Sequence, residues 1–188
     1  MDAIHINDIA IDPTIDASIL TASRQVSVAN NYSPDGQQYD KFVVGAAIFR
    51  YNTGKPRLLL LKRGDNEAYF PGVFEIPGGK VDFEDASIRH AAVREAWEET
   101  GLVVTAFRAE LKPMLYSTEK VGKNGEVVLK RAIQLNYVVS ESGSEEVVVS
   151  EGEHSENVWA AEEDLRQLRI TDEMREVVRE EYSRVGVL

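Results

Sequence analysis

The feature that most constrains the fold of this sequence is residues 86–100, a run of good helix formers without glycine or proline that is followed by Gly101. Such a run predicts an α-helix, and a glycine directly after the last residue is typical of a helix C-terminus. Successive helical residues are turned by about 100°, so Glu95, Glu98 and Glu99 fall on one stripe. The expected helix therefore carries three carboxylates close together.

Carboxylates crowded on one stripe repel one another unless a cation lies among them. A solvated helix face is the ordinary alternative, but exposed glutamates then usually face lysines four residues away. Here the neighbours on the stripe are the small Ala91 and Ala92. Because hard oxygen ligands select Mg²⁺ or Mn²⁺ over thiophilic metals, we predict a site for one of these cations. Val93 and Trp97 lie on the other side of the helix, where we expect both to be buried against a sheet.

Apolar runs of strand length lie on both sides of this helix. An Asn-Gly pair at 124–125, between two such runs, predicts a β-hairpin. Two further helices are expected near the C-terminus. The chain should therefore be an α+β domain, in which helices pack on a central sheet. The expected strands are residues 42–49, 57–62, 73–76, 115–121, 127–139 and 147–149, and the expected C-terminal helices are residues 162–168 and 172–184.

Length and composition limit the classes of protein that the chain can represent. Its 188 residues suffice for one ordinary core, and we expect an N-terminal extension at residues 1–40 and a domain at residues 41–188. The 32 acidic and 21 basic residues give a formal charge of −11, and no basic patch indicates a nucleic-acid partner. The absence of cysteines, of a signal peptide and of a membrane-spanning apolar run favours a cytoplasmic protein without a membrane partner.

One motif is specific to a known family. Gly79-Lys-Val-Asp-Phe-Glu-Asp85 and Arg94-Glu-Ala-Trp-Glu-Glu-Thr-Gly-Leu102 together resemble the Nudix box, G-x5-E-x7-R-E-U-x-E-E-x-G-U, where U is an aliphatic residue. The second half matches at every fixed position, with the small Ala96 at the first U. The resemblance covers roughly residues 41–170 and includes the later Glu-His-Ser-Glu-x-x-Trp segment, residues 153–159. It implies the Nudix fold, a mixed β-sheet sandwiched between α-helices, and a Nudix hydrolase domain.

The first half of the box departs from the family pattern. Counted from Gly79, the place of the first box glutamate holds Asp85, whereas counted back from Arg94 it holds Ala86. Either the loop has one extra residue and Asp85 or Glu84 takes the place of that glutamate, or this carboxylate is missing. In the family this glutamate chiefly steadies the arginine and the loop, so the metal site survives the departure better than the loop geometry does.

The resemblance also implies the residues of the metal site. Glu95 and Glu99 would be the principal ligands of Mg²⁺ or Mn²⁺. Glu98 would be a further ligand or would hold a water of the metal. The carbonyl group of Gly79 would complete the site where the loop meets the helix.

The activity that the resemblance implies is hydrolysis of a diphosphate linkage in a nucleoside diphosphate derivative or a related organic diphosphate. Arg94 would pair with Asp85 or Glu98 and fix the loop. The general base would be a carboxylate, either on the box helix or on the later loop. The candidate catalytic residues are Glu99, Arg94, Glu98, Glu153 and Glu156.

Substrate recognition is assigned to side chains near the box. The candidate substrate-binding residues are Tyr69, Phe74 and Lys80, and the aromatic rings could stack on a base or line an apolar pocket. Of the two histidines near the site, we expect His90 to be a surface or packing residue and His154 to hydrogen-bond within its loop.

A second hypothesis comes from a different class of protein. The irregular first half of the box supports a Nudix-fold binding or regulatory module that has lost hydrolysis. The complete set of Glu95, Glu98 and Glu99 argues against it, because a retired site has no reason to keep crowded carboxylates. An acidic protein with exposed strands is compatible with a homodimer.

Overall fold

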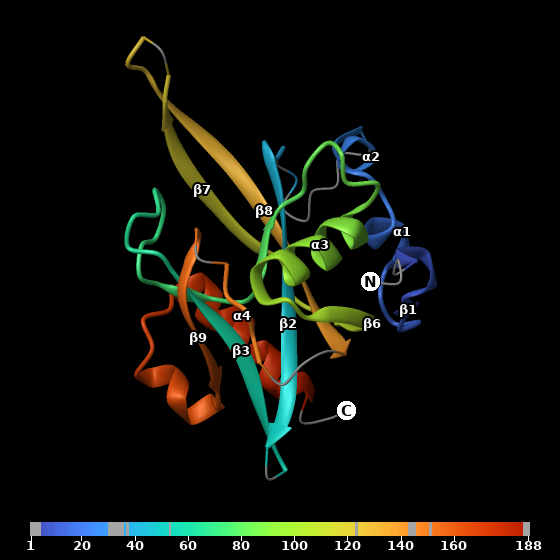
Figure 1. The fold of residues 1–188 in the computed structure, drawn as a ribbon. Helices are drawn as coiled ribbons and strands as arrows, with labels where there is room; N and C mark the ends of the chain where they lie inside the picture. Colours follow the sequence, from blue (N-terminus) through green and yellow to red (C-terminus); the bar gives the residue numbers. More distant parts are fainter. Residues whose placement is uncertain are drawn as a thin grey trace.

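A computed structural model describes residues 5–29, 36, 38–52, 54–122, 124–142, 146–150 and 152–185. In this part of the chain, nine strands form a mixed sheet, and helices lie on both of its faces (Figure 1). This arrangement confirms the α+β class expected from the sequence. No helix within the described ranges is both long and apolar enough to cross a membrane.

The central strand of the sheet is β2 (Lys41–Asn52). It pairs in parallel with β8 (Val127–Ser142) and antiparallel with β3 (Lys55–Arg63) and β5 (Gly78–Lys80). The strands expected at the positions of β2, β3 and β8 are therefore confirmed. The strand order is β1 (Ala10–Ile11), β6 (Val103–Glu110), β8, β2, β3 and β4 (Phe74–Glu75), with β7 (Met114–Val121) added to β8 and β9 (His154–Ala160) added to β3.

Each face of the sheet is covered by its own helix, because side chains alternate along a strand. Val44 and Ala46 of β2 belong to the core cluster that contains α3 (Ile88–Thr100). Ala47 belongs to the cluster that contains α4 (Asp172–Val185). Helix α3 lies in front of the sheet and α4 behind it in Figure 1. The α4 helix confirms the helix expected at residues 172–184.

Helix α3 is capped at both ends. The hydroxyl group of Ser87, its N-cap, accepts a hydrogen bond from the backbone N–H of His90 at 3.2 Å. Gly101 has a φ angle of 70°, and its N–H donates to the carbonyl group of Trp97 at 2.8 Å. Because Ser87 is the cap, the helix begins at Ile88 rather than at residue 86. Both ends of α3 are thus fixed by local sequence.

The described N-terminal residues pack onto the α3 side of the domain. β1 pairs in parallel with β6, and the short helices α1 (Ala17–Leu20) and α2 (Arg24–Ala29) follow it. Leu20 is fully buried, and Ile9 and Ile15 join the same core cluster as α3. Residues 5–29 therefore contribute to the main core.

Some expectations about local structure are wrong. Residues 147–149 form a loop rather than a strand, because the N–H of Val148 donates to the carbonyl group of Thr100 at the end of α3. Trp97 is 44% exposed rather than buried, since it lies in the last turn of α3, beside a cleft. Strand β9 had no counterpart in the sequence prediction. The short helix expected at 162–168 is a 3-10 helix, Glu162–Arg166.

We predict that Leu20→Ala destabilises the domain by about 2–5 kcal/mol, the cost of removing a fully buried leucine side chain. The matched control is Val26→Ala, because Val26 is an apolar N-terminal residue that is 46% exposed. Urea unfolding monitored by circular dichroism measures both free energies of unfolding. Equal, small effects of the two substitutions would show that residues 5–29 do not support the core.

Candidate functional site

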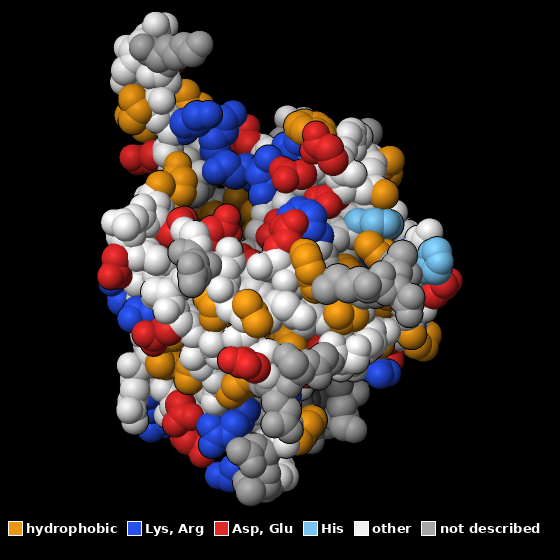
Figure 2. All heavy atoms as spheres, viewed as in Figure 1, with side chains coloured by type: hydrophobic (Ala, Val, Ile, Leu, Met, Phe, Trp, Pro, Cys, Tyr) orange, Lys and Arg blue, Asp and Glu red, His pale blue; other side chains and the backbone are white. Residues whose placement is uncertain are grey.

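Acidic side chains from α3 gather against the turn that β5 forms. Glu95 and Glu99 are both buried, with exposed fractions of 9% and 4%. The N–H of Gly78 donates to Oε2 of Glu99 at 2.7 Å. Together with the more exposed Glu98, these residues line a cleft of about 790 Å³. Figure 2 shows acidic and basic side chains gathered side by side in this part of the surface, below the projecting β7–β8 hairpin.

The glycines of the turn are required by close contacts. A Cβ atom on Gly79 would lie 2.6 Å from the carboxylate of Glu95, and one on Gly78 would lie 2.1 Å from the carbonyl oxygen of Val44. At Gly78 the obstacle is backbone, whereas at Gly79 it is the carboxylate of Glu95, which a larger residue would displace. The backbone of the turn is therefore pressed between the sheet and the carboxylates of α3. A metal-ligating role for the Gly79 carbonyl group stays a prediction.

Arg94 joins the loop before α3 to the acidic stripe. Its guanidinium donates to both carboxylate oxygens of Asp85, at 3.0 and 2.8 Å, and to Glu95 and Glu98 at 2.8 and 3.0 Å. Burial alone would raise the pKa of Asp85, but its hydrogen bonds with Arg94 and Asp82 outweigh burial and lower that pKa. Asp85, rather than Glu84, is thus the loop carboxylate that holds Arg94.

The start of β9 brings to Glu99 two more side chains that can bind a metal: Glu153, directly before the strand, and His154, its first residue. Oxygen or nitrogen atoms of Glu99, Glu153 and His154 lie within 4.8 Å of one another, close enough to share one metal ion. The backbone N–H of His154 donates to the carbonyl group of Ser150 at 3.1 Å, as expected for a residue that hydrogen-bonds within its loop. Within the described part of the chain its imidazole makes no such bond and instead faces Glu99, at 3.9 Å. The sequence segment that contains Glu153 and His154 was recognised, but the pairing of β9 with β3, which turns His154 inward, was not.

Burial dominates the electrostatics of the cleft. It raises the pKa of Glu99 to about 9, with further contributions from Glu95, Glu75 and Glu153, while the hydrogen bond from Gly78 opposes the shift. Burial also raises the pKa of Glu95, against the effect of Arg94. The cleft thus holds acidic groups that ionise reluctantly until a positive charge arrives.

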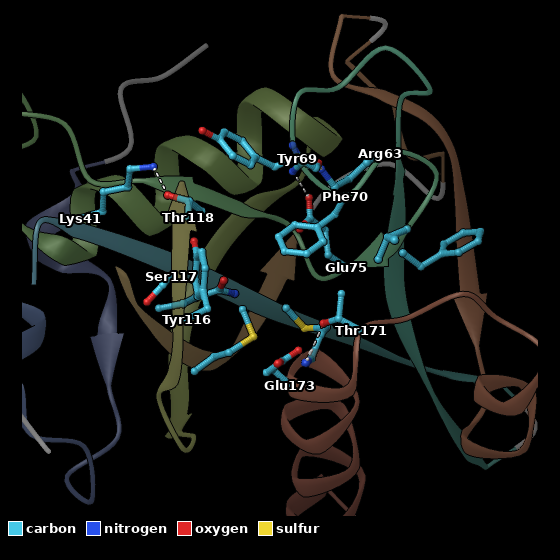
Figure 3. Close-up of a pocket in the computed structure, with 15 residues that line it drawn as sticks. Lys41, Arg63, Tyr69, Phe70, Glu75, Tyr116, Ser117, Thr118, Thr171 and Glu173 are labelled. Atoms are coloured by element: carbon cyan, nitrogen blue, oxygen red, sulfur yellow. Dashed lines mark hydrogen bonds and ion pairs between the residues drawn. The ribbon is translucent and has the colours of Figure 1, made fainter. Parts of the chain in front are cut away.

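A second hollow adjoins the acidic cleft, and Arg63 lines both. This pocket of about 330 Å³ is bordered by Lys41 and Tyr116 on one side and by Arg63 and Phe70 on the other (Figure 3). Phe70 is 49% exposed and has a φ angle of 53°, which is uncommon for a residue other than glycine. The aromatic residues that line the pocket are Tyr69, Phe70, Phe74 and Tyr116.

The remaining candidates are divided between the two hollows and the surface. Lys80 lines the acidic cleft and pairs with Asp82 at 2.7 Å. Phe74 and Tyr69 line the aromatic pocket, and Phe74 is also part of the core. Glu156 is exposed, is not among the residues that line the acidic cleft, and pairs with Lys62 at 3.2 Å. The structure thus brings Glu153, but not Glu156, to the carboxylate cluster.

Comparison with known proteins gives a consistent match. A family model described as NUDIX domain matches residues 41–180. The chain is 45% identical over 53 residues to Putative nudix hydrolase 7 of Caenorhabditis elegans. It is 48% identical over 48 residues to Uncharacterized Nudix hydrolase NudL of Enterobacter sp. (strain 638). Each alignment covers 26% of this chain, and the chain spans 18% and 25% of the length of these two relatives.

Solved structures match most of the chain. The MutT protein from Methanosarcina mazei Go1 is 26% identical with a TM-score of 0.59, covering 78% of this chain and 94% of that chain. The NUDIX domain of Shewanella oneidensis NrtR complexed with ADP ribose is 19% identical with a TM-score of 0.59, and the match covers 89% of this chain and 100% of that chain. A C. elegans Ap4A hydrolase is 22% identical with a TM-score of 0.56, and the match covers 79% of this chain and 99% of that chain. The fold expected from the box is therefore confirmed.

We predict that Glu99→Gln stabilises the metal-free protein at pH 8. The folded-state pKa of about 9 lies above the ordinary glutamate pKa of 4.5, so the folded protein binds more protons than the unfolded chain and loses stability as pH rises between these values. Glutamine cannot ionise and removes this loss. The melting temperature in a chelator should rise by at least about 2–4 °C, the effect of roughly 1 kcal/mol.

The matched control is Glu162→Gln, because Glu162 is exposed. Both variants and the wild type are also melted at pH 5, where the rise in melting temperature caused by Glu99→Gln should be smaller. A gain that is absent at pH 8, or equal at both pH values, would contradict the assignment of Glu99 as a buried, reluctantly ionised acid.

Proposed function

The chain belongs to the NUDIX domain family, and from this premise we propose that it is a hydrolase of a diphosphate linkage in a nucleoside diphosphate derivative or related organic diphosphate, with Mg²⁺ or Mn²⁺ as cofactor. The observation that carries the proposal is the cleft in which Glu95, Glu98, Glu99 and Glu153 meet the glycine turn. The match to the family model covers residues 41–180, which include all of these side chains.

The donor atoms of the cleft fit a divalent cation. They are carboxylate oxygens, the ligands that Mg²⁺ and Mn²⁺ prefer, and the two buried carboxylates need a positive charge to ionise. Glu95 and Glu99 would hold the ion, with Glu98 at the exposed rim and the Gly79 carbonyl group beside Glu95. When bound, the cation neutralises phosphate oxygens and lowers the pKa of a water.

The protein's own residues supply the rest of the chemistry. Glu153 lies beside Glu99 and is exposed to the cleft, so it can accept the proton of the water that attacks phosphorus. The bond between that phosphorus and the bridging oxygen breaks, and the other phosphate leaves. We prefer Glu153 to Glu156 as the base because Glu156 pairs with Lys62 outside the cluster.

Arg94 is a positioning residue in this proposal. Its hydrogen bonds with Asp85 tie the loop to α3, and its contacts with Glu95 and Glu98 hold those side chains in place. The charge of the guanidinium also limits the repulsion among the carboxylates. Asp85 would therefore replace the first glutamate of the box. The extra residue of the loop would compensate for the shorter side chain of aspartate.

The aromatic pocket would receive the group attached to the diphosphate. Arg63 borders both hollows, so a substrate can place its diphosphate near Glu99 and its organic group near Phe70. A flat ring could stack there, which favours a nucleoside. ADP ribose, bound by one similar domain, has this form and belongs in the first substrate panel.

The binding-module hypothesis is tested by the same panel of nucleotide sugars, ADP ribose, dinucleoside polyphosphates and nucleoside triphosphates, with Mg²⁺ or Mn²⁺. Product formation from any of them supports the enzyme. Tight binding of one compound without product from any would favour a module that has lost hydrolysis.

We predict that Glu99→Gln lowers kcat by at least about 100-fold on the best substrate of the panel, as expected for the loss of a metal-ligand or base carboxylate. Phosphate-release kinetics measure this effect, with Glu162→Gln as the surface control. Retained activity in a folded Glu99→Gln protein would remove the proposed metal site.

We predict that Phe70→Ala raises KM by about 5- to 30-fold with a smaller change in kcat, because loss of base stacking costs roughly 1–2 kcal/mol. Tyr51→Ala is the matched control, since Tyr51 is an aromatic side chain that is 61% exposed on β2. An unchanged KM in Phe70→Ala would place the organic group elsewhere.

A further inference from the structure

His154 is a buried side chain whose polar atoms are unsatisfied. The side chain is 2% exposed, and within the described residues neither ring nitrogen has a hydrogen-bond partner. A buried polar group without a partner is unfavourable because it has given up its hydrogen bonds with water, so such groups are rare unless they bind something else. The imidazole is therefore placed for a ligand rather than for packing alone.

The Nδ1 atom of His154 faces the carboxylate of Glu99. It lies 3.9 Å from Oε1 of Glu99, which is too long for a hydrogen bond. Two ligands bound to one cation at roughly 2.0–2.2 Å each can lie up to about 4 Å apart, so this spacing fits a shared ion. Glu153 brings a third donor within 4.8 Å of both.

The opposite ring nitrogen also faces a carboxylate, on the side where metal-binding histidines commonly donate a hydrogen bond, although the distance here is longer than a hydrogen bond. Nε2 lies 3.7 Å from Oε1 of Glu75. Glu75 is itself held by Arg63 at 2.6 Å. A carboxylate behind a histidine fixes the tautomer and orientation of the ring and makes the other nitrogen a better ligand. The imidazole of His154 thus lies between Glu75, which Arg63 holds by a hydrogen bond, and Glu99, without a hydrogen bond to either carboxylate.

We propose that Glu99, Glu153 and His154 form a cation site with one nitrogen ligand, which binds Mn²⁺ more tightly than Mg²⁺. The inference deepens the proposed function, since Glu99 belongs to both carboxylate sets. Binding of the cation uses one oxygen of Glu153, so its second carboxylate oxygen stays available to accept the proton of the attacking water. Imidazole nitrogen is a poor ligand for Mg²⁺ but an acceptable one for transition metals, whereas the Glu95 and Glu98 side of the cleft offers oxygen alone. His154 is the residue that makes the two ends of the cleft chemically different.

The test needs no substrate. The metal-free protein of 188 residues is loaded with one equivalent of Mn²⁺, and electron spin echo envelope modulation is recorded to detect a directly bound ¹⁴N nucleus. The wild type should show this coupling, and His154→Gln should lose it. His90→Gln and His5→Gln, which change the other two histidines of the chain, should retain it.

Titration calorimetry gives the matching affinities. His154→Gln should weaken Mn²⁺ binding by about 10-fold or more while Mg²⁺ affinity changes by less than about 3-fold, as for loss of one nitrogen ligand. Equal losses for both cations, a wild-type spectrum without nitrogen coupling, or a coupling that persists in His154→Gln would overturn the proposal.

The wild-type spectrum decides the question even where the variant does not fold. Failure of the proposed function would look different, because a protein that binds Mn²⁺ through nitrogen yet releases no phosphate from any diphosphate would retain the site and lose the activity.

Discussion

The arrangement of this protein depends on two carboxylates that are buried where a strand turn meets a helix. Glu99 accepts a hydrogen bond from Gly78, and the carboxylate of Glu95 lies so close to Gly79 that a side chain at this glycine would displace it. Burial of acidic groups is unfavourable unless positive charge is supplied. Arg94 supplies part of that charge permanently, and a bound cation would supply the rest.

The fold positions these groups through its central strand. β2 holds β5 along one edge, which fixes the glycine turn, and its buried side chains pack against α3, which fixes the carboxylates. β3 holds β9, which delivers Glu153 and His154 to the same place. Elements that are distant in the sequence therefore meet at one cleft, with the aromatic pocket adjoining it at Arg63.

Local sequence signals predicted the parts of the fold that local physics decides. The helix at α3 follows from its composition and from Gly101, and the β7–β8 hairpin follows from its Asn-Gly turn. Local signals do not predict contacts between segments that are far apart in the sequence. The sequence did not show that Val148 would bind the end of α3, that Trp97 would border a cleft, or that His154 would turn toward Glu99.

The central claim is that a cation enters among carboxylates that are reluctant to ionise. Calorimetric titration of Mg²⁺ at pH 8, in buffers of different ionisation enthalpy, counts the protons released on binding. With the pKa of Glu99 at about 9, roughly one proton should leave for each Mg²⁺ bound. Binding without proton release, or no binding at all, would contradict the account.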